Sequence, residues 1–272
     1  MDWLYKAMLT ATTVALLLAL AQRCGRRTAG LVAGLPIIAA PALVWLAHAH
    51  GPAFAAEAGA GCMSAGGLCA LFALGYGRAS RRAGPAAALL AGGGLALLPV
   101  PLLAQWRPND GVLMALALAC CAASTALLRA LPQPGRPPQP TPRRPATVGA
   151  SAQVALTAGA SGAVSGGVGL FAADLGAFWA GVVASAPLVA AAVSIWLHHH
   201  RGSVALPPFL HGYLAGLIGR TCFAALFALL VVPLGAMPAV LLAGSALCLS
   251  VWLNGRRALA RDPALTADVT VR

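Results

Sequence analysis

Charged residues are scarce in this chain. They make up 9% of its 272 residues, only six of them are acidic, and 60% of the residues are hydrophobic. Because charged residues are about a quarter of an ordinary soluble domain, this composition excludes that class and places the chain in lipid. The net charge of +12 does not indicate a nucleic-acid partner, since the arginines form tight clusters between apolar stretches and cover no helix face with interleaved aromatic residues.

Motifs for catalysis and cofactor binding are also missing. The sequence has no phosphate-cradling glycine loop with a lysine, no carboxylate pair at an active spacing and no serine elbow. Its seven cysteines form no CxxC pair and no secreted-domain pattern, and most lie within apolar stretches as small packing residues. We therefore expect no enzyme, no catalytic residue, no cofactor and no metal site.

Apolar stretches close to the ~20 residues that cross a hydrocarbon core recur along the chain. They predict an all-α integral membrane protein with nine transmembrane helices. The first stretch is expected to be a retained helix, because Asp2 and Lys6 make a poor basic leader and no compelling cleavage site follows. The predicted spans cover residues 4–21, 29–49, 53–76, 84–104, 111–130, 150–171, 177–197, 208–231 and 235–253.

Arginine clusters follow alternate predicted spans, and basic residues in short loops stay on the cytoplasmic side of a membrane. Asp2, Asp110 and Asp174 occupy the opposite loops, with Arg107 as the single basic exception. The pattern predicts a bacterial inner-membrane protein with a periplasmic N-terminus and a cytoplasmic C-terminus. The clusters are Arg23, Arg26 and Arg27; Arg78, Arg81 and Arg82; Arg136, Arg143 and Arg144; Arg201; and Arg256, Arg257 and Arg261.

Two stretches of the sequence match in register. GLVAGLPIIAAPALVWLAHAHG starts at Gly30 and GVVASAPLVAAAVSIWLHHHRG starts at Gly181, 151 residues later. A proline, a tryptophan, a histidine and the glycines recur together, which chance rarely produces. Four spans would return the chain to its starting side, so the fifth span, 111–130, is expected to turn the second copy upside down.

These features divide the chain into four parts. We expect a first four-helix repeat over 1–105, an inverting helix and a cytoplasmic linker over 106–149, an inverted second repeat over 150–255 and a cytoplasmic tail over 256–272. The linker sequence LPQPGRPPQPTPRRPATVG cannot form a helix, because proline lacks the amide donor. A spacer is favoured over a docking site for this segment.

Each copy carries an A-G-L/V…P…W/Y-L/I…G stretch in its second helix. The residues are Ala29, Gly30, Leu31, Pro36 and Gly51 in the first copy, and Ala180, Gly181, Val182, Pro187 and Gly202 in the second. A four-helix unit with this stretch resembles the GlpM/YdgC-like family of small dual-topology inner-membrane proteins. The resemblance implies two such units fused through an extra helix. It implies no reaction or substrate, because none is established for that family. Strong arginine clusters set this chain apart from single-copy members.

Pro36 and Pro187 lie inside predicted helices, where each removes the hydrogen bond to the carbonyl of Val32 or Val183. Such freed carbonyls need a partner in lipid. They line the substrate path of inverted-repeat transporters, and the alternative is a kink satisfied by a neighbouring helix. Separately, the spacings Gly30xxxGly34 and Gly181xxxSer185 allow close helix approach and favour packing seams.

Arg220 lies near the middle of the eighth predicted span, where an arginine costs about 2.5 to 3.5 kcal/mol on insertion scales. Glu57, a few residues into the third span, is the best-placed carboxylate for an ion pair with it. The alternative is that Arg220 snorkels or binds only carbonyls. His211 lies in the same span and could join a proton path with Arg220.

Histidines and tryptophans end the matched helices. His48 and the run that includes His199 suit helix C-termini at the interface, and consecutive histidines on a helix point in different directions, so they make a poor metal cage. Trp45 and Trp196 stand where aromatic belts anchor helices.

The sequence therefore favours a transporter or channel for a small solute or an ion. The alternative is a non-transporting scaffold or accessory subunit of an envelope-biosynthesis complex. Expected partners are the lipid bilayer and the solute or ion, with no nucleic acid, and a homodimer or a larger membrane complex stays open. A polar cavity near the midplane would favour transport, and a dry, fully packed interface between the halves would favour the scaffold.

Overall fold

The computed structural model describes residues 26–106, 108–130 and 170–261, together with single residues within 8–15 and 155–167. These residues form helices joined by short turns, with no strand among them. The elements are α2 (Arg26–Gly34), α3 (Ala39–His50), α4 (Pro52–Ala79), α5 (Pro85–Leu97), α6 (Val100–Gln105), α7 (Asp110–Ala130), α9 (Ala177–Ala184), α10 (Leu188–Arg201), a 3-10 turn (Ser203–Ala205), α11 (Leu206–Leu234) and α12 (Ala236–Arg261).

Six helical stretches are long and apolar enough to cross a membrane, so the described part of the chain is that of a multi-pass, all-α membrane protein. They are Arg26–His50, Pro52–Ala79, Pro85–Gln105, Asp110–Ala130, Ala177–Arg201 and Ser203–Leu234, and a shorter apolar stretch, Ala236–Leu249, follows. The six stretches match six predicted spans, from 29–49 to 111–130 together with 177–197 and 208–231, within about five residues, and the shorter stretch lies inside the predicted span 235–253. The first span (4–21), most of the sixth (150–171) and the linker lie outside the described residues.

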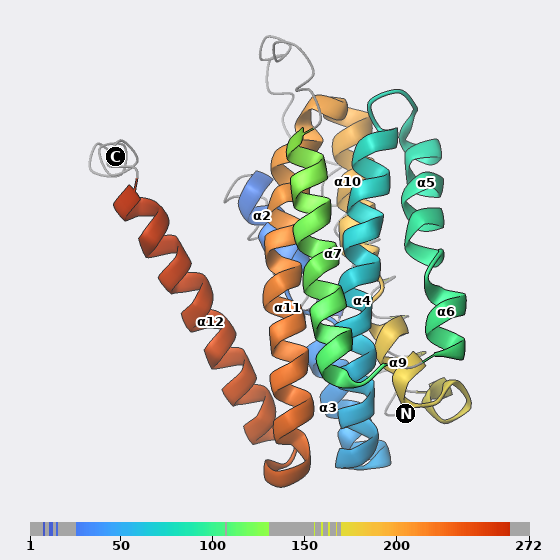
Figure 1. Cartoon of the computed structure of the whole chain (residues 1–272), viewed down its shortest axis with the longest axis vertical. Helices are drawn as coiled ribbons and strands as arrows, with labels where there is room; N and C mark the ends of the chain where they lie inside the picture. Colours follow the sequence, from blue (N-terminus) through green and yellow to red (C-terminus); the bar gives the residue numbers. More distant parts are fainter. Residues whose placement is uncertain are drawn as a thin grey trace.

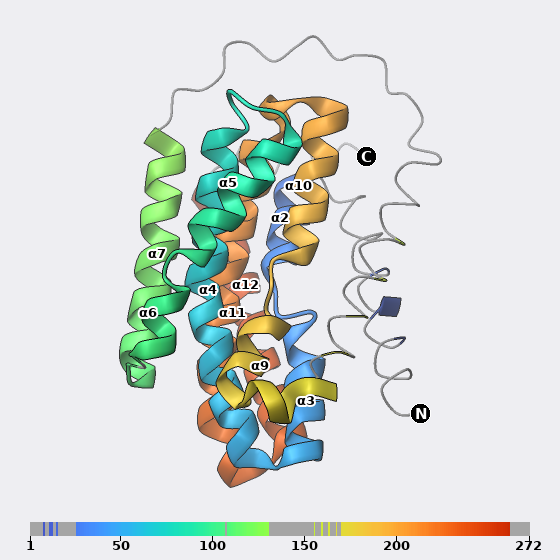
Figure 2. The same cartoon turned by 90° about the vertical axis from the view of Figure 1, so that its right-hand side faces the viewer.

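Helices α4 and α11 form the centre of the bundle and run antiparallel along its long axis (Figures 1 and 2). The other helices pack around this pair: α2 lies mainly on α11, whereas α9 and α5 lie on α4, and α7 contacts both. In lipid, helices associate through close packing rather than through the hydrophobic effect, and small residues at the contact permit it. The stretch GAGCMSAGG in the middle of α4 supplies such residues.

Gly51 and Gly202 make the same reversal in two places. Their φ angles are +92° and +71°, a conformation that residues with a Cβ rarely adopt. Gly51 ends α3 and starts α4, and Gly202 ends α10 and leads into α11. Each glycine therefore joins an interrupted helix to a central helix.

Large apolar side chains cover the outer surface of the bundle. Leu90, Leu102 and Leu116 are exposed on α5, α6 and α7, and Leu229 and Leu241 are exposed on α11 and α12. Exposed leucines in such numbers are expected where the surrounding medium is hydrocarbon.

The charged residues separate between the two ends of the bundle. The starts of α2 and α5 and the ends of α4, α7 and α10 meet at one end, at the top of Figure 1. The arginines of these termini therefore gather there, and the end of α12 lies toward the same side. Asp110 and Asp174 lie at the opposite end, where α7 and α9 begin. Arg107 lies outside the described residues.

Candidate functional site

Two helices are interrupted in the middle of the bundle. The chain leaves helical geometry between Gly34 and Ala39, and again between Ala184 and Leu188. Figure 2 shows α2 beside α10 and α3 beside α9, so that both interruptions lie at mid-height. A proline stands inside each interruption, at positions 36 and 187.

The carbonyls that these prolines were expected to leave unpaired have local partners. Leu35 N–H donates to the Val32 oxygen at 3.1 Å, and Ala186 N–H donates to the Val183 oxygen at 3.1 Å. The expectation that these oxygens reach a substrate or a neighbouring helix is wrong, because tight turns satisfy them within the same segment. Other backbone groups are left over, among them the carbonyls of Ala33 and Ala184 and several amides. The N–H groups of Ile38, Ala39, Val189 and Ala190, at the starts of α3 and α10, have no hydrogen-bond partner in the described part of the chain.

A small cavity lies between the two interruptions. It has a volume of about 20 Å³, which is room for one water-sized particle. Arg220 and Tyr213, both on α11, contribute polar side chains to its wall. The other lining residues have apolar side chains and come from both interrupted helices: Ala33, Leu35, Ile37, Ile38, Ala39, Ala184, Ala186, Pro187, Val189 and Ala190.

The Arg220 side chain is only 5% exposed. The energetic cost predicted for an arginine in mid-span therefore applies to a buried guanidinium. Its Nη1 donates to the Ser185 oxygen at 3.2 Å and its Nη2 to the Ala65 oxygen at 3.4 Å, while Nε has no partner. Both acceptors are neutral carbonyls. The guanidinium therefore has hydrogen bonds but no counter-charge among the described residues.

The predicted ion pair between Glu57 and Arg220 is not formed. Glu57 is exposed and lies eight residues before Ala65, about 12 Å along α4. The repeat argument placed these residues on facing helices correctly, but it did not place them at the same depth. Arg220 instead follows the other alternative that the sequence left open, binding to carbonyls.

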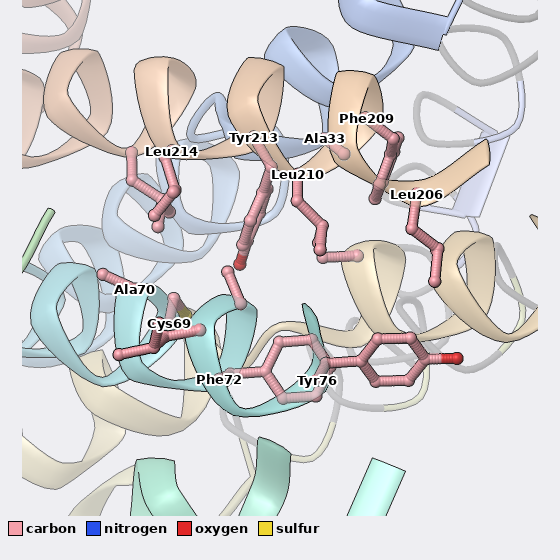
Figure 3. Packing of buried hydrophobic residues seen from close by; sticks show 14 of the residues in the cluster. Ala33, Cys69, Ala70, Phe72, Tyr76, Leu206, Phe209, Leu210, Tyr213 and Leu214 are labelled. Carbon is pink, nitrogen blue, oxygen red and sulfur yellow. The ribbon is translucent and has the colours of Figure 1, made fainter. Parts of the chain in front are cut away.

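Tyr213 and Cys69 join Arg220 at the centre and were missed from the sequence. Figure 3 shows the Tyr213 side chain extending from α11 toward α4, where Cys69 lies. The buried Tyr213 hydroxyl has no hydrogen-bond partner, and the Cys69 thiol donates to the Ser185 oxygen at 3.4 Å, the same oxygen that Arg220 binds. The 151-residue offset pairs Cys69 with Arg220 in the sequence, a signal that could have identified Cys69.

His211 lies apart from this centre. It precedes Arg220 by nine residues on α11, about 14 Å along the helix. It lines a second cavity, of about 10 Å³, beside Ser80 and Arg81 toward the arginine-rich end. Residues Glu57, His211 and Arg220 therefore do not form one cluster, so a direct proton path between them has no geometric support.

The predicted packing glycines lie in tight helix contacts. Gly30 and Gly34 face the backbone of α11 at Phe209 and Gly216, and Gly181 faces the backbone of Ala58 on α4. An added Cβ at these glycines would overlap main-chain atoms that no rotamer change can move. Ser185 differs from them: its carbonyl accepts the hydrogen bonds of Arg220 and Cys69, and its buried hydroxyl has no partner.

The tryptophans and histidines predicted as anchors lie at the outer ends of α3 and α10. His48 Nδ1 is 2.9 Å from the Val44 oxygen and its ring meets Trp45 edge-on, whereas Trp196 stacks on His200 with ring centroids 5.0 Å apart. His199 is exposed beside them. Within the described ranges no three potential metal ligands come together.

The arrangement as a whole concentrates hydrogen-bond donors around a water-sized space deep inside the bundle. Unpaired amides of two helix starts, a guanidinium and a phenol hydroxyl surround it, and no carboxylate is within ion-pair distance of the guanidinium in the described structure. Chemically, a buried guanidinium without a counter-charge is suited to hold an electron-rich particle. The chain matches no protein-family model, and it has no significant similarity to a curated protein or to a solved structure.

Proposed function

We propose that the chain is a small inner-membrane transporter or channel for a small solute or an ion, built from two inverted halves. The observation that carries this proposal is the polar cavity at mid-depth, lined by both interrupted helices and by the buried Arg220. Interrupted helices that meet at the bilayer midplane are a recurring design of transporters with inverted repeats. A buried ionisable residue that faces a cavity in a membrane protein commonly marks an ion or substrate path.

Equivalent contacts support the inverted halves. Gly30 lies against Phe209, and the residues 151 positions later and earlier, Gly181 and Ala58, also lie against each other. The contact of Gly61 with Phe178 has the same counterpart in the contact of Gly212 with Arg27. Each interrupted helix thus packs on the central helix of the other half, as a two-fold arrangement requires.

Chain direction supports the inversion. The segment from α2 to α3 runs from the arginine-rich end to the opposite end, and the segment from α9 to α10 runs the other way (Figure 2). Helix α7 spans the bundle between them and supplies the odd crossing. By the positive-inside rule we assign the arginine-rich end to the cytoplasm, and the predicted spans 4–21 and 150–171 would then give a periplasmic N-terminus and nine spans in total.

The likeness of each half to GlpM and YdgC is part of this proposal. In a dual-topology homodimer two identical units meet in opposite orientations, and a fused duplicate joined by an odd helix makes the same arrangement in one chain. The arginine clusters then hold each half in a single orientation.

A scaffold without transport activity is the second candidate, and the close glycine contacts between α2 and α11 favour it. Such contacts leave little open space: the central cavity is only water-sized. Under this alternative Arg220 and the prolines contribute to stability alone, and the proline-rich and arginine-rich linker would serve a partner of an envelope-biosynthesis complex.

Reconstitution into liposomes tests the proposal. Flux of a panel that contains alkali cations, halides and small neutral solutes is measured with purified protein, with empty liposomes and with Arg220→Leu. We expect flux of one class that Arg220→Leu abolishes at normal protein abundance. Absence of flux for the whole panel, or loss of Arg220→Leu from the membrane together with its flux, would favour the scaffold.

Topology is tested separately. A reporter fused after Ala146 should be cytoplasmic, because Asp110–Ala130 brings the chain back to the arginine-rich side. A periplasmic reporter would contradict the inversion of the second half.

A further inference from the structure

We propose that the central cavity is a binding site for a small monovalent anion of the halide class, with Arg220 as its main ligand. This inference rests on the proposed function in one respect only: it names the substrate class that a transport path through this cavity would accept. The binding site itself can exist in a protein that transports nothing, and this makes the two ideas separable.

The first argument is charge. Arg220 is buried, bears a permanent positive charge and has no carboxylate partner in the described structure. The carbonyls of Ser185 and Ala65 solvate two of its donors but do not neutralise it. A bound anion would supply the missing charge, and the unpaired Nε–H is a donor for it.

The second argument is the polarity of the two helix starts. Helices α3 and α10 both begin beside the cavity, and Ile38, Ala39, Val189 and Ala190, whose amides are unpaired, line it. The start of a helix carries a partial positive charge and favours anions. Because α3 and α10 leave the centre in opposite directions (Figure 2), their positive ends converge on one space.

The C-terminal ends of α2 and α9 also lie at the centre, and several carbonyls there already accept hydrogen bonds. Helix α9 ends at Ala184, and the Ser185 oxygen just after it already accepts hydrogen bonds from Arg220 and Cys69. The Val32 and Val183 oxygens accept bonds within their own turns. The carbonyls of Ala33 and Ala184 on the wall have no partner in the described structure, but the positive charge of Arg220 repels a cation. The Arg220 Nε–H and the Tyr213 hydroxyl are unpaired donors, so the site favours an anion.

Size and charge define the class of anion. A volume of about 20 Å³ admits one water-sized particle, which matches a monatomic anion better than phosphate, sulfate or a carboxylate such as gluconate. The position that matches Arg220 in the first half is the neutral Cys69, so the centre carries one positive charge and not two. One charge balances a monovalent anion.

Binding is measured on the full-length protein in nanodiscs by isothermal titration with sodium fluoride, chloride, bromide and gluconate, at constant ionic strength. We expect saturable binding of at least one halide and none of gluconate. Arg220→Gln should weaken halide binding at least tenfold, because it removes the charge. Arg82→Gln, which removes an exposed charge at the end of the bundle, should leave the affinity within twofold.

Tyr213→Phe keeps the ring and its packing while removing one donor, so it tests the site if Arg220→Gln does not fold. We expect threefold to tenfold weaker halide binding. The proposal is overturned if the wild-type protein binds no halide saturably, if gluconate binds as well as the halides, or if the folded variants at 213 and 220 retain wild-type affinity.

Flux measurements on the same preparations separate the two ideas. Halide binding that needs Arg220, without flux of any solute, upholds the anion site and rejects transport. Flux of a cation or a neutral solute without halide binding upholds transport and rejects the anion site.

Discussion

The two central helices, α4 and α11, occupy matching places in the bundle but bring different chemistry to its centre. Each receives the interrupted helix of the opposite half on a glycine-lined face. At the positions that the 151-residue offset relates, α4 has Cys62 and Cys69 where α11 has Tyr213 and Arg220. The cysteines donate weak hydrogen bonds to the Gly181 and Ser185 carbonyls, whereas the tyrosine and arginine line the cavity.

Under the proposed duplication, this difference separates a feature present in both halves from one that differs between them. Close backbone contact uses a glycine in both places, Gly30 against Phe209 and Gly181 against Ala58. A charge near a two-fold axis is different, because an identical second copy would place two guanidiniums side by side. In this chain the position on α4 that the offset relates to Arg220 is the neutral Cys69, so that repulsion does not arise.

The largest expected effect comes from breaking the shared scaffold. Gly181→Leu places a side chain against the backbone of Ala58, and we expect it to cost about 5 kcal/mol or more, enough to abolish folded protein. Gly94→Leu, at a helical glycine with open space around it, is the matched control and should fold normally. Size-exclusion profiles of detergent-purified variants measure this, and a monodisperse Gly181→Leu protein would contradict the packing.

Exchange of Cys69 and Arg220 tests the comparison of α4 with α11 most directly. Cys69→Arg alone adds a second buried positive charge and should destabilise the protein by about 3 to 5 kcal/mol. The double variant Cys69→Arg with Arg220→Cys restores one charge at the related position and should recover most of that loss. Thermal unfolding of the wild type, both single variants and the double variant gives the coupling between the sites. A double variant no more stable than Cys69→Arg would mean that the halves are not interchangeable at this depth.

Removal of the charge should affect stability little. Arg220→Met deletes a desolvated charge and two hydrogen bonds, and replacement of a buried ion by an apolar side chain of similar volume is often neutral or stabilising. We expect a change within about 1 kcal/mol, together with loss of flux in liposomes. A loss of several kcal/mol would assign Arg220 a structural role.

The smallest effect is expected at the unpaired hydroxyl. Tyr213→Phe removes a buried polar group without a partner, so stability in a halide-free buffer should stay the same or rise by about 1 kcal/mol. Thermal unfolding in gluconate buffer measures the change. A clear destabilisation would show that the hydroxyl has a partner important for folding.

The transmembrane helices were predictable because span length and hydropathy are local properties. Arg26–His50 and Asp110–Ala130 lie within a few residues of their predicted bounds. The interruptions at Pro36 and Pro187 were predictable for the same reason, since proline alone removes the helical bond. The fate of the freed carbonyls was predicted wrongly, because the turns that satisfy Val32 and Val183 depend on backbone geometry that proline permits but does not specify.

The centre was predictable only in part. Arg220 was identifiable as a charge inside an apolar span. Its partners were not, because the depth at which α4 meets α11 depends on how their glycines interlock, and that depth put Ala65 and not Glu57 beside it. Tyr213 gave no signal of its own, since an aromatic residue in an apolar span is ordinary core.

By itself, then, the sequence determined the helical class, the bounds of most apolar helices in the described part of the chain and the separation of charge between the two ends. All of these follow from residues acting within one helix or one loop. Tertiary structure alone decided which donors face the cavity and that no carboxylate reaches Arg220 among the described residues. Those outcomes depend on the relative depth and rotation of packed helices, which backbone contacts at glycine set and which no single helix encodes.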